Sequence, residues 1–420
     1  MGKLDIFEPF NKRKILNDPI YGFISMPNEL IYDLVEHPYF QRLRRIKQVG
    51  MSHLVYPGAN HTRFHHALGA THLMQTAITN LREKGVEISE EEARGALVAI
   101  LLHDIGHGPF SHSLEFTVVK NVGHEVISAL LMERLNKEFN GALTTGIQIF
   151  TGEYPKPFLH QLVSSQLDMD RLDYLSRDSF FTGVSEGVVS NQRIIKMLNV
   201  YNDELVVEEK GIYSIEKFIV ARRLMYWQVY LHKTVVAAER LLINILTRAK
   251  FCARRGDKLF GSPALCYFLY HDYGQDDFIN DPEVIDTFVK LDDFDIMGAI
   301  KVWTTHEDKI LSDLCNKLTD RRLPSAILSN NPFNENEVNA LKQKTMELLD
   351  LSTDDLKYYF HLDVLENHAY DRDYNGINIL TKSGNLIDLA EASDNRALLA
   401  QTEAVKKYVL YIPKEVKKNA

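Results

Sequence analysis

The chain has 420 residues, with 48 Lys and Arg against 57 Asp and Glu, which gives a formal net charge of −9. The acidic excess lies in residues 271–320, where 13 acidic residues face 4 basic ones, so the rest of the chain is balanced. This distribution excludes a protein that binds nucleic acid through bulk positive charge, although it leaves room for a local anion site.

Three cysteines without a CxxC spacing exclude a disulfide framework and a zinc ribbon, and they favour a reducing compartment. The sequence has no secretory signal and no apolar run of the roughly 18–20 residues that span a bilayer. We therefore expect a cytoplasmic protein without a membrane partner.

Residues 28–250 are expected to be mostly helical. Ser89 and Glu92 form the S-x-x-E pattern of a capping box before an apolar helix that runs into His103 and Asp104. Other helices are predicted over 61–84, 122–139, 159–177, 191–200 and 215–255. Two short strands are predicted at 204–208 and 211–214, joined around Lys210 and Gly211.

After residue 256 the pattern changes. The acidic stretch still reads as helical, and alternating segments then predict strands within 323–328, 357–364, 376–382, 385–391 and 407–413. A hairpin is expected around Ser383 and Gly384. The prediction is a mainly α fold, with a helical domain over 1–255 and a smaller α+β region over 256–420. That region holds a small antiparallel sheet and is expected to be structural or to serve oligomerisation.

Histidines are concentrated, since nine of the 16 fall in residues 53–124. Imidazole and carboxylate are natural ligands of a divalent transition metal. An ionisable pair such as His103 and Asp104 at the end of a buried helix costs free energy unless it is compensated. A metal ion would compensate both groups, and a hydrogen-bonded His–Asp pair is the alternative. His107 is four residues from His103 and can share its face.

Two polar stripes accompany this motif. Asp170, Asp173, Tyr174, Arg177 and Asp178 recur at helical spacing, a pattern that alone is typical of a solvated helix face. Further along the chain is a second stripe, made by Arg222, Tyr226, Tyr230 and Lys233. Alone it indicates an amphipathic helix with a basic edge, whereas beside a metal site it favours a wall that binds phosphates and stacks an aromatic ring.

The set formed by His66, His103, Asp104 and Asp170 resembles the signature of the HD-domain metal-dependent phosphohydrolases. More narrowly, the chain is similar to the deoxynucleoside triphosphate triphosphohydrolases, including mammalian SAM-and-HD-domain and bacterial dGTPase-like members. The resemblance is strong over 14–250. The matching stretches are DPIYGFI (18–24), FQRLRRIKQVG (40–50), YPGANHTRFHHALG (56–69), LLHDIGHGPFSH (101–112), GHE (123–125), DMDRLDYLSRD (168–178) and YLHK (230–233).

The resemblance implies an HD-type helical core and hydrolysis of a deoxynucleoside triphosphate (dNTP) to deoxynucleoside and inorganic triphosphate. One divalent transition metal (Fe, Mn, Zn or Ni) would be bound by the four signature residues, with Mg²⁺ accompanying the triphosphate. The histidines that match catalytic positions are His107, His112 and His124. The residues that match substrate-binding positions are Gln48, Arg63, Arg171, Tyr174, Asp178, Arg222 and Tyr230.

The resemblance also implies a homo-oligomer, as a tetramer or a dimer of dimers, and an activating nucleotide bound at a site that includes Lys14, Gln41 and Arg44. His65 is an alternative to His66 as a metal ligand. Two other functions stay open: an HD-family phosphomonoesterase or phosphodiesterase acting on nucleotides, and a nucleotide- or nucleic-acid-binding module with vestigial catalysis.

Overall fold

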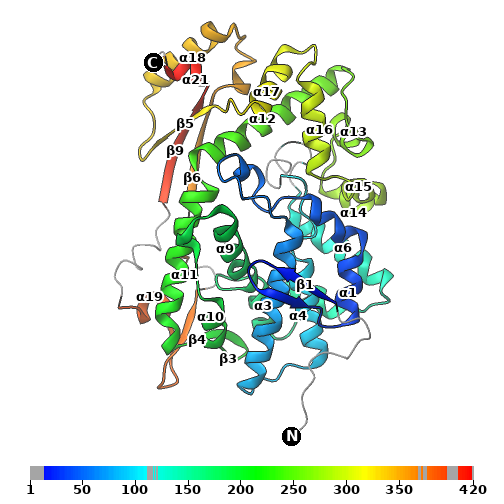
Figure 1. The fold of residues 1–420 in the computed structure, drawn as a ribbon, viewed down its shortest axis with the longest axis vertical. Helices are drawn as coiled ribbons and strands as arrows, with labels where there is room; N and C mark the ends of the chain where they lie inside the picture. Colours follow the sequence, from blue (N-terminus) through cyan, green and yellow to red (C-terminus); the bar gives the residue numbers. More distant parts are fainter. Residues whose placement is uncertain are drawn as a thin grey trace.

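The computed structural model describes residues 14–110, 117, 119, 122–367, 370–371, 376–394 and 405–418. Helices dominate this part of the chain (Figure 1). In chain order they are α1 (Glu29–Glu36), α2 (Pro38–Gln41), α3 (Arg63–Glu83), α4 (Glu90–Leu102), α6 (His124–Glu138), α7 (Thr144–Thr151), α8 (Pro157–Val163), α9 (Met169–Thr182), α10 (Asn191–Met197), α11 (Ile212–Met225), α12 (Lys233–Arg255), α13 (Pro263–Tyr270), α14 (Gln275–Asn280), α15 (Pro282–Phe288), α16 (Asp293–Trp303), α17 (Lys309–Thr319), α18 (Glu335–Leu349), α19 (Leu389–Ala392) and α21 (Lys414–Lys418).

The strands form three small sheets. They are β1 (Ile15–Asp18), β2 (Gly22–Ser25), β3 (Leu198–Tyr201), β4 (Glu204–Glu208), β5 (Ser325–Ser329), β6 (His361–Asn367), β7 (Asn378–Leu380), β8 (Leu386–Asp388) and β9 (Val405–Ile412). β1 and β2 form a hairpin, β5-β9-β6 is antiparallel, and β3-β4-β7-β8 contains one parallel pair between β4 and β7. The predicted mainly α fold with a C-terminal antiparallel sheet is confirmed, as is the β7–β8 hairpin around Ser383 and Gly384.

The helices that matter for function are α3, α4 and α9, which lie side by side because α3 packs against both others (Figure 1). The predicted capping box begins α4: the Ser89 hydroxyl accepts the Glu92 backbone N–H, and the Glu92 carboxylate accepts the Ser89 N–H at 2.7 Å. From Ala96 to Leu102 every residue of α4 is buried. The apolar helix therefore carries His103 and Asp104 into the protein interior.

One predicted strand and one predicted turn are wrong. Residues 211–214 do not form a strand, since α11 begins at Ile212. The hairpin instead pairs β3 with β4 and turns at Asn202 and Asp203, whose φ angles are 53° and 60°. Asn and Asp tolerate this left-handed backbone better than most residues. The predicted helix 191–200 ends at Met197, because the chain from Leu198 is extended and pairs with β4 as β3.

The predicted helix 215–255 is interrupted. A π-helical turn spans Tyr226–Tyr230, and α12 starts afresh at Lys233 after the His232 cap. Val236 and Ala237 of α12 pack against Val409 and Tyr411 of β9, so this helix joins the helical part to the C-terminal sheet. None of the described helices is long and apolar enough to cross a membrane. The division into domains at residue 255 stays a prediction.

Removing the Asp308 carboxylate should destabilise the junction between α12 and α17. Asp308 caps α17 and pairs with the buried Arg248 through two contacts of 3.0 and 2.8 Å. Asp308→Ala removes one acidic partner of the buried Arg248 guanidinium. We therefore expect a loss of about 3–5 kcal/mol in the free energy of unfolding. Urea unfolding followed by tryptophan fluorescence measures it.

Asp320→Ala is the matched control, because Asp320 pairs with Arg322 at 3.2 Å and both side chains are exposed. We expect a change below about 0.5 kcal/mol for it. Equal unfolding midpoints for the two variants would contradict the assigned role of Asp308.

Candidate metal centre and active site

Four ionisable side chains from three helices meet in the interior. His66 lies in the first turn of α3, His103 and Asp104 follow α4, and Asp170 lies in the first turn of α9. The His66 Nε2 atom lies 3.1 Å from Asp170 Oδ1 and 3.4 Å from His103 Nε2. His103 Nε2 lies 3.4 Å from Asp104 Oδ1 and 3.5 Å from Asp170 Oδ1. We call these four residues the His–Asp cluster.

Hydrogen bonds at the Nδ1 atoms fix the direction of both imidazoles. The His66 Nδ1 atom donates to Asp173 Oδ2 at 2.8 Å, and His103 Nδ1 donates to the Ile100 carbonyl at 2.7 Å. Arg177 donates to both oxygens of Asp173 at 2.9 and 3.0 Å, and it also pairs with Asp18 at 2.7 Å. Such outer hydrogen bonds set the tautomer of a metal-binding histidine. Both Nε2 atoms consequently face the carboxylates of the cluster.

Charges inside the cluster are strongly coupled. Burial lowers the pKa of His66, but the Asp170 and Asp173 carboxylates outweigh it and raise that pKa to about 10. Burial opposes ionisation of Asp104, whereas His103 and Arg63 more than offset it and hold the pKa of that carboxyl well below its usual range. The cluster therefore favours two carboxylates balanced by positive charge.

The donor set fits a divalent transition metal. Ligand atoms about 2.0–2.2 Å from one ion lie roughly 3.0–3.5 Å from one another, which is the spacing seen between the Nε2 and carboxylate atoms here. His66, His103 and Asp170 each offer an atom within 4.8 Å of the others, and Asp104 lies against them. Two imidazoles with two carboxylates are a borderline set that suits Fe, Mn, Zn or Ni.

A second group of histidines adjoins the cluster. His107 Nε2 lies 3.2 Å from Asp104 Oδ1, and its ring stacks on His124 with centroids 3.7 Å apart. Gly106 makes this stacking possible, because a side chain there would overlap the His124 carbonyl and Ser128 of α6. Burial, followed by the nearby Arg63 guanidinium, lowers the pKa of His107 to about 3. The predicted catalytic residue His112 lies outside the described residues.

Basic and aromatic side chains predicted to bind substrate adjoin the cluster. Arg63 donates to Asp104, and Arg171 donates to Asp168 at 2.6 Å. The Tyr174 ring lies 6.5 Å from His66 and 6.1 Å from Tyr230. Arg171 and Arg222 both act electrostatically on Tyr174, whose pKa burial raises well above its ordinary value. The structure thus brings Arg171, Tyr174, Arg222 and Tyr230 together, and Arg63 adjoins the cluster through Asp104.

Gln48 and Asp178 lie at the other end of this wall. Asp178 is 2% exposed and accepts from His61 Nε2 and from the Tyr230 hydroxyl, each at 2.6 Å. The segment with Gln48 pairs with that of His61, since the Gln48 N–H donates to the His61 carbonyl at 3.0 Å. The Gln48 Oε1 atom is buried and has no hydrogen-bond partner among the described residues. It is an acceptor that a ligand could satisfy.

The three residues predicted for a second nucleotide site gather around α1. Lys14 donates to Tyr32 and lies 3.7 Å from Glu36. Gln41 donates to the Val35 carbonyl at 2.7 Å and accepts from Arg44 at 2.8 Å.

Sequence reasoning did not assign four residues that support the site: Asp18, His61, Asp173 and Arg177. Asp173 and Arg177 do follow Asp170 at helical spacing, and this was the signal that could have found them. The alternative ligand His65 faces away: its Nδ1 accepts the Thr62 backbone N–H at 3.2 Å, at the start of α3. His66, and not His65, belongs to the cluster.

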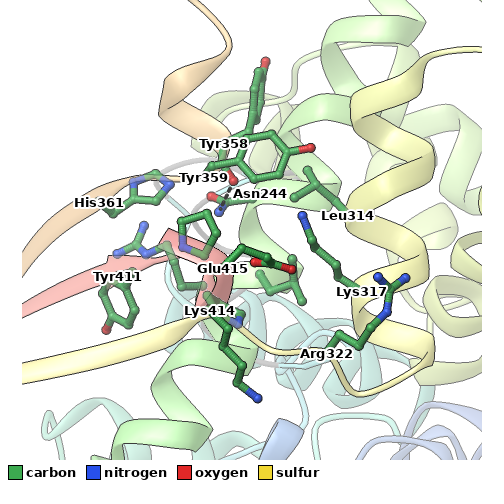
Figure 2. Close-up of a pocket in the computed structure, with 14 residues that line it drawn as sticks. Asn244, Leu314, Lys317, Arg322, Tyr358, Tyr359, His361, Tyr411, Lys414 and Glu415 are labelled. Carbon is green, nitrogen blue, oxygen red and sulfur yellow. Dashed lines mark hydrogen bonds between the residues drawn. The ribbon is translucent and has the colours of Figure 1, made fainter. Parts of the chain in front are cut away.

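A separate pocket, open to solvent, lies between α12, α17 and the β5-β9-β6 sheet (Figure 2). Tyr358, Tyr359 and Tyr411 form part of its wall. Three of its four Lys and Arg side chains are paired with acids: Arg240 with Asp363, Lys317 with Asp313, and Arg322 with Asp320. Because most of this charge is already paired, the pocket is less suited than the His–Asp cluster to bind a phosphate.

Comparisons with known proteins agree on one family. A model described as "HD domain" matches residues 63–178, and one described as "HD associated region" matches 189–250. A crystal structure of a phosphohydrolase from Bacteroides thetaiotaomicron is 54% identical, covers 96% of this chain and 100% of that one, and superimposes with a TM-score of 0.91. The uncharacterized protein YwfO of Bacillus subtilis is 32% identical over 97% of this chain and 93% of its own length.

A third relative has a named activity. The deoxynucleoside triphosphate triphosphohydrolase SAMHD1 homolog of Dictyostelium discoideum is 32% identical over 59% of this chain and 51% of its own length. The chain thus spans about half of that enzyme.

Gly69 provides a test of the support behind the cluster. A side chain at this position of α3 would overlap both Asp173 and Arg177, so Gly69→Ala should displace the Asp173 carboxylate from His66 without changing a ligand. We expect metal affinity, measured by titration and elemental analysis, to fall about 10- to 100-fold. Asp173→Asn keeps the size of the side chain, and its metal affinity should fall to a similar extent.

Gly298→Ala is the control, because a Cβ at this position of α16 meets nothing within 4 Å. It should keep the metal and gain about 0.5–1 kcal/mol of stability. If Gly69→Ala holds metal as tightly as Gly298→Ala, the supporting role of Asp173 is refuted.

Proposed function

Because the chain belongs to the HD-domain family of metal-dependent phosphohydrolases, we propose that it hydrolyses dNTPs to deoxynucleoside and inorganic triphosphate. The observation that carries the proposal is the position of Arg63. This arginine contacts Asp104 of the His–Asp cluster, and Tyr174, on which Arg171 and Arg222 act electrostatically, lies 6.5 Å from His66 of the same cluster. A phosphate bound at the cluster would therefore have guanidinium groups beside it for the rest of a triphosphate chain.

His66, His103, Asp104 and Asp170 would hold the metal ion. When bound, a divalent ion supplies Lewis acidity toward a phosphate oxygen and makes a neighbouring water more acidic. Residues of the chain then bind and orient the substrate. Arg63, Arg171 and Arg222 bind the triphosphate oxygens, orient the α-phosphorus and stabilise the charge that develops there.

The reaction forms a bond between the water oxygen and the α-phosphorus and breaks the bond from phosphorus to the 5′ oxygen. His107 suits a hydrogen bond to the α-phosphate, because its low pKa keeps it neutral at pH 7. His124, which stacks on His107, and His112 are then the candidates to donate the proton to the leaving 5′ oxygen.

The sugar would lie at Gln48 and Asp178. The unsatisfied Oε1 of Gln48 is an acceptor for a 3′-hydroxyl, and Asp178 keeps lone pairs for a further donor beside His61 and Tyr230. The Tyr230 ring is held by its hydroxyl on Asp178, where it would crowd a 2′-hydroxyl. This arrangement favours deoxyribose over ribose.

A phosphomonoesterase or phosphodiesterase acting on nucleotides is the second candidate, because the cluster alone suits any phosphate ester. The three arginines favour the triphosphate. A homo-oligomer and an activating nucleotide at Lys14, Gln41 and Arg44 remain predictions.

The purified protein with Mn²⁺ should convert a dNTP to deoxynucleoside and triphosphate, as resolved by ion-pair chromatography. His66→Ala should lower kcat/KM by about 1,000-fold or more and release the metal, because it removes a ligand and leaves Asp173 unpaired on one side. His65→Ala is the matched control and should keep metal and activity within a few fold, since His65 serves only the start of α3. Chelation should abolish turnover in both active proteins.

Release of nucleoside monophosphate or diphosphate in place of deoxynucleoside would support the second candidate and refute the triphosphohydrolase. Loss of metal in His65→Ala but not in His66→Ala would overturn the ligand assignment.

A further inference from the structure

A buried carboxylate outside both matched family regions contacts two segments of the candidate site. Asp293, the first residue of α16, is 6% exposed. Its Oδ1 accepts the Phe110 backbone N–H at 3.1 Å, and its Oδ2 accepts the Lys47 backbone N–H at 2.9 Å. One side chain from the acidic stretch 271–320 thus links two distant parts of the chain.

Both of these parts lead directly to site residues. Phe110 lies three residues after His107, and its φ of 51° is a left-handed conformation that a large side chain rarely adopts without support. Lys47 precedes Gln48, and the Ile46 carbonyl next to it accepts the Arg63 N–H at 3.0 Å. Asp293 therefore connects the segment after the His103–Asp104 motif with the segment that begins α3.

Arg42 makes a second connection between the same regions. This guanidinium, 1% exposed, donates to the Leu291 carbonyl just before α16 at 3.0 Å. It also donates to the Ile105 carbonyl at 3.1 Å and to the His107 carbonyl. The chain around His107 is consequently held on two sides by groups that converge at the start of α16.

Capping of α16 does not account for Asp293. Asp292 is the capping residue, since it accepts the Phe294 N–H at 2.9 Å, and Asp295 completes the capping box. The Asp293 carboxylate points instead at backbone N–H groups of other segments. Burying a carboxylate costs free energy, and because the helix is already capped, capping does not explain why the Asp293 carboxylate is buried.

We propose that Asp293 is a positioning residue of the hydrolytic site: its carboxylate holds the segment from His103 to Phe110 in register with the segment that carries Gln48, which is itself hydrogen-bonded to the start of α3 at Arg63. The kinetic consequence rests on the proposed function. The structural consequence does not, because it concerns the two N–H groups alone.

Asp293→Asn is the sharpest probe, because asparagine keeps the shape but has one acceptor oxygen for two N–H donors. We expect kcat for dNTP hydrolysis to fall about 10- to 100-fold, as misplacement of catalytic groups does. The KM should stay within about threefold and the metal content should not change. Hydrogen exchange should become about tenfold faster or more at the Phe110 or Lys47 amide.

Asp292→Asn is the matched control on the same helix, since asparagine caps helices as well as aspartate. It weakens a pair with the half-exposed Arg45, which contributes little, and Asp292 contacts neither segment's N–H. It should match wild type in all four measurements. Arg42→Lys is a second variant, which keeps the charge but loses the planar fork that reaches two carbonyls of the segment, and it should reproduce the loss in kcat.

Unchanged kcat and exchange in Asp293→Asn overturn the proposal, as does a fall in kcat matched by loss of metal or by unfolding in the same samples. If wild type does not hydrolyse dNTPs, the proposed function fails, and the exchange rates still decide the inference. Faster exchange in Asp293→Asn than in Asp292→Asn supports it, and equal exchange overturns it.

Discussion

The site depends on one buried ion pair, between Asp173 and Arg177. The Asp173 carboxylate accepts from His66 Nδ1 and from two nitrogens of Arg177, and Arg177 in turn pairs with Asp18. A fully buried carboxylate is costly unless it is paired and hydrogen-bonded. Here the Arg177 guanidinium compensates the charge of the Asp173 carboxylate, and that carboxylate fixes the orientation of the His66 imidazole. Because His66 Nδ1 is held in this way, Nε2 has to face Asp170 and His103.

Close packing of the helices makes this chemistry geometrically possible. α3 approaches α9 at Gly69, where any side chain would meet the Asp173–Arg177 pair, and α6 approaches the end of α4 at Gly106. The apolar residues of α4 then bury His103 and Asp104 where water cannot screen their charges. The same packing that forms the core therefore sets the pKa values and the directions of the site's side chains.

The complete His–Asp cluster and the role of the aromatic and basic wall were predicted from the family resemblance, whereas residue types and helical spacing alone indicated only that His103 and Asp104 could bind a metal. They could not predict which partner each side chain takes across helices, because that depends on packing distance. Asp173 was visible only as part of a polar stripe, and His61 only as one of several adjacent histidines. The misplaced hairpin has a local cause: Lys210-Gly211 looked like a turn, whereas Asn202-Asp203 adopts the two left-handed conformations. The π-helical turn at Tyr226–Tyr230 left no signal in the periodicity.

The net charge of the chain also acquires a structural meaning. Residues of the acidic stretch 271–320 pair with basic residues of the helical region: Asp292 with Arg45, Asp286 with Arg134, and Asp308 with Arg248. The local excess is therefore partly cancelled across the contact between the two parts of the chain. Asp293 stands apart, since its carboxylate is buried against backbone N–H groups. A carboxylate used in this way orients a segment through hydrogen bonds of fixed direction, which a surface ion pair between flexible side chains does not do.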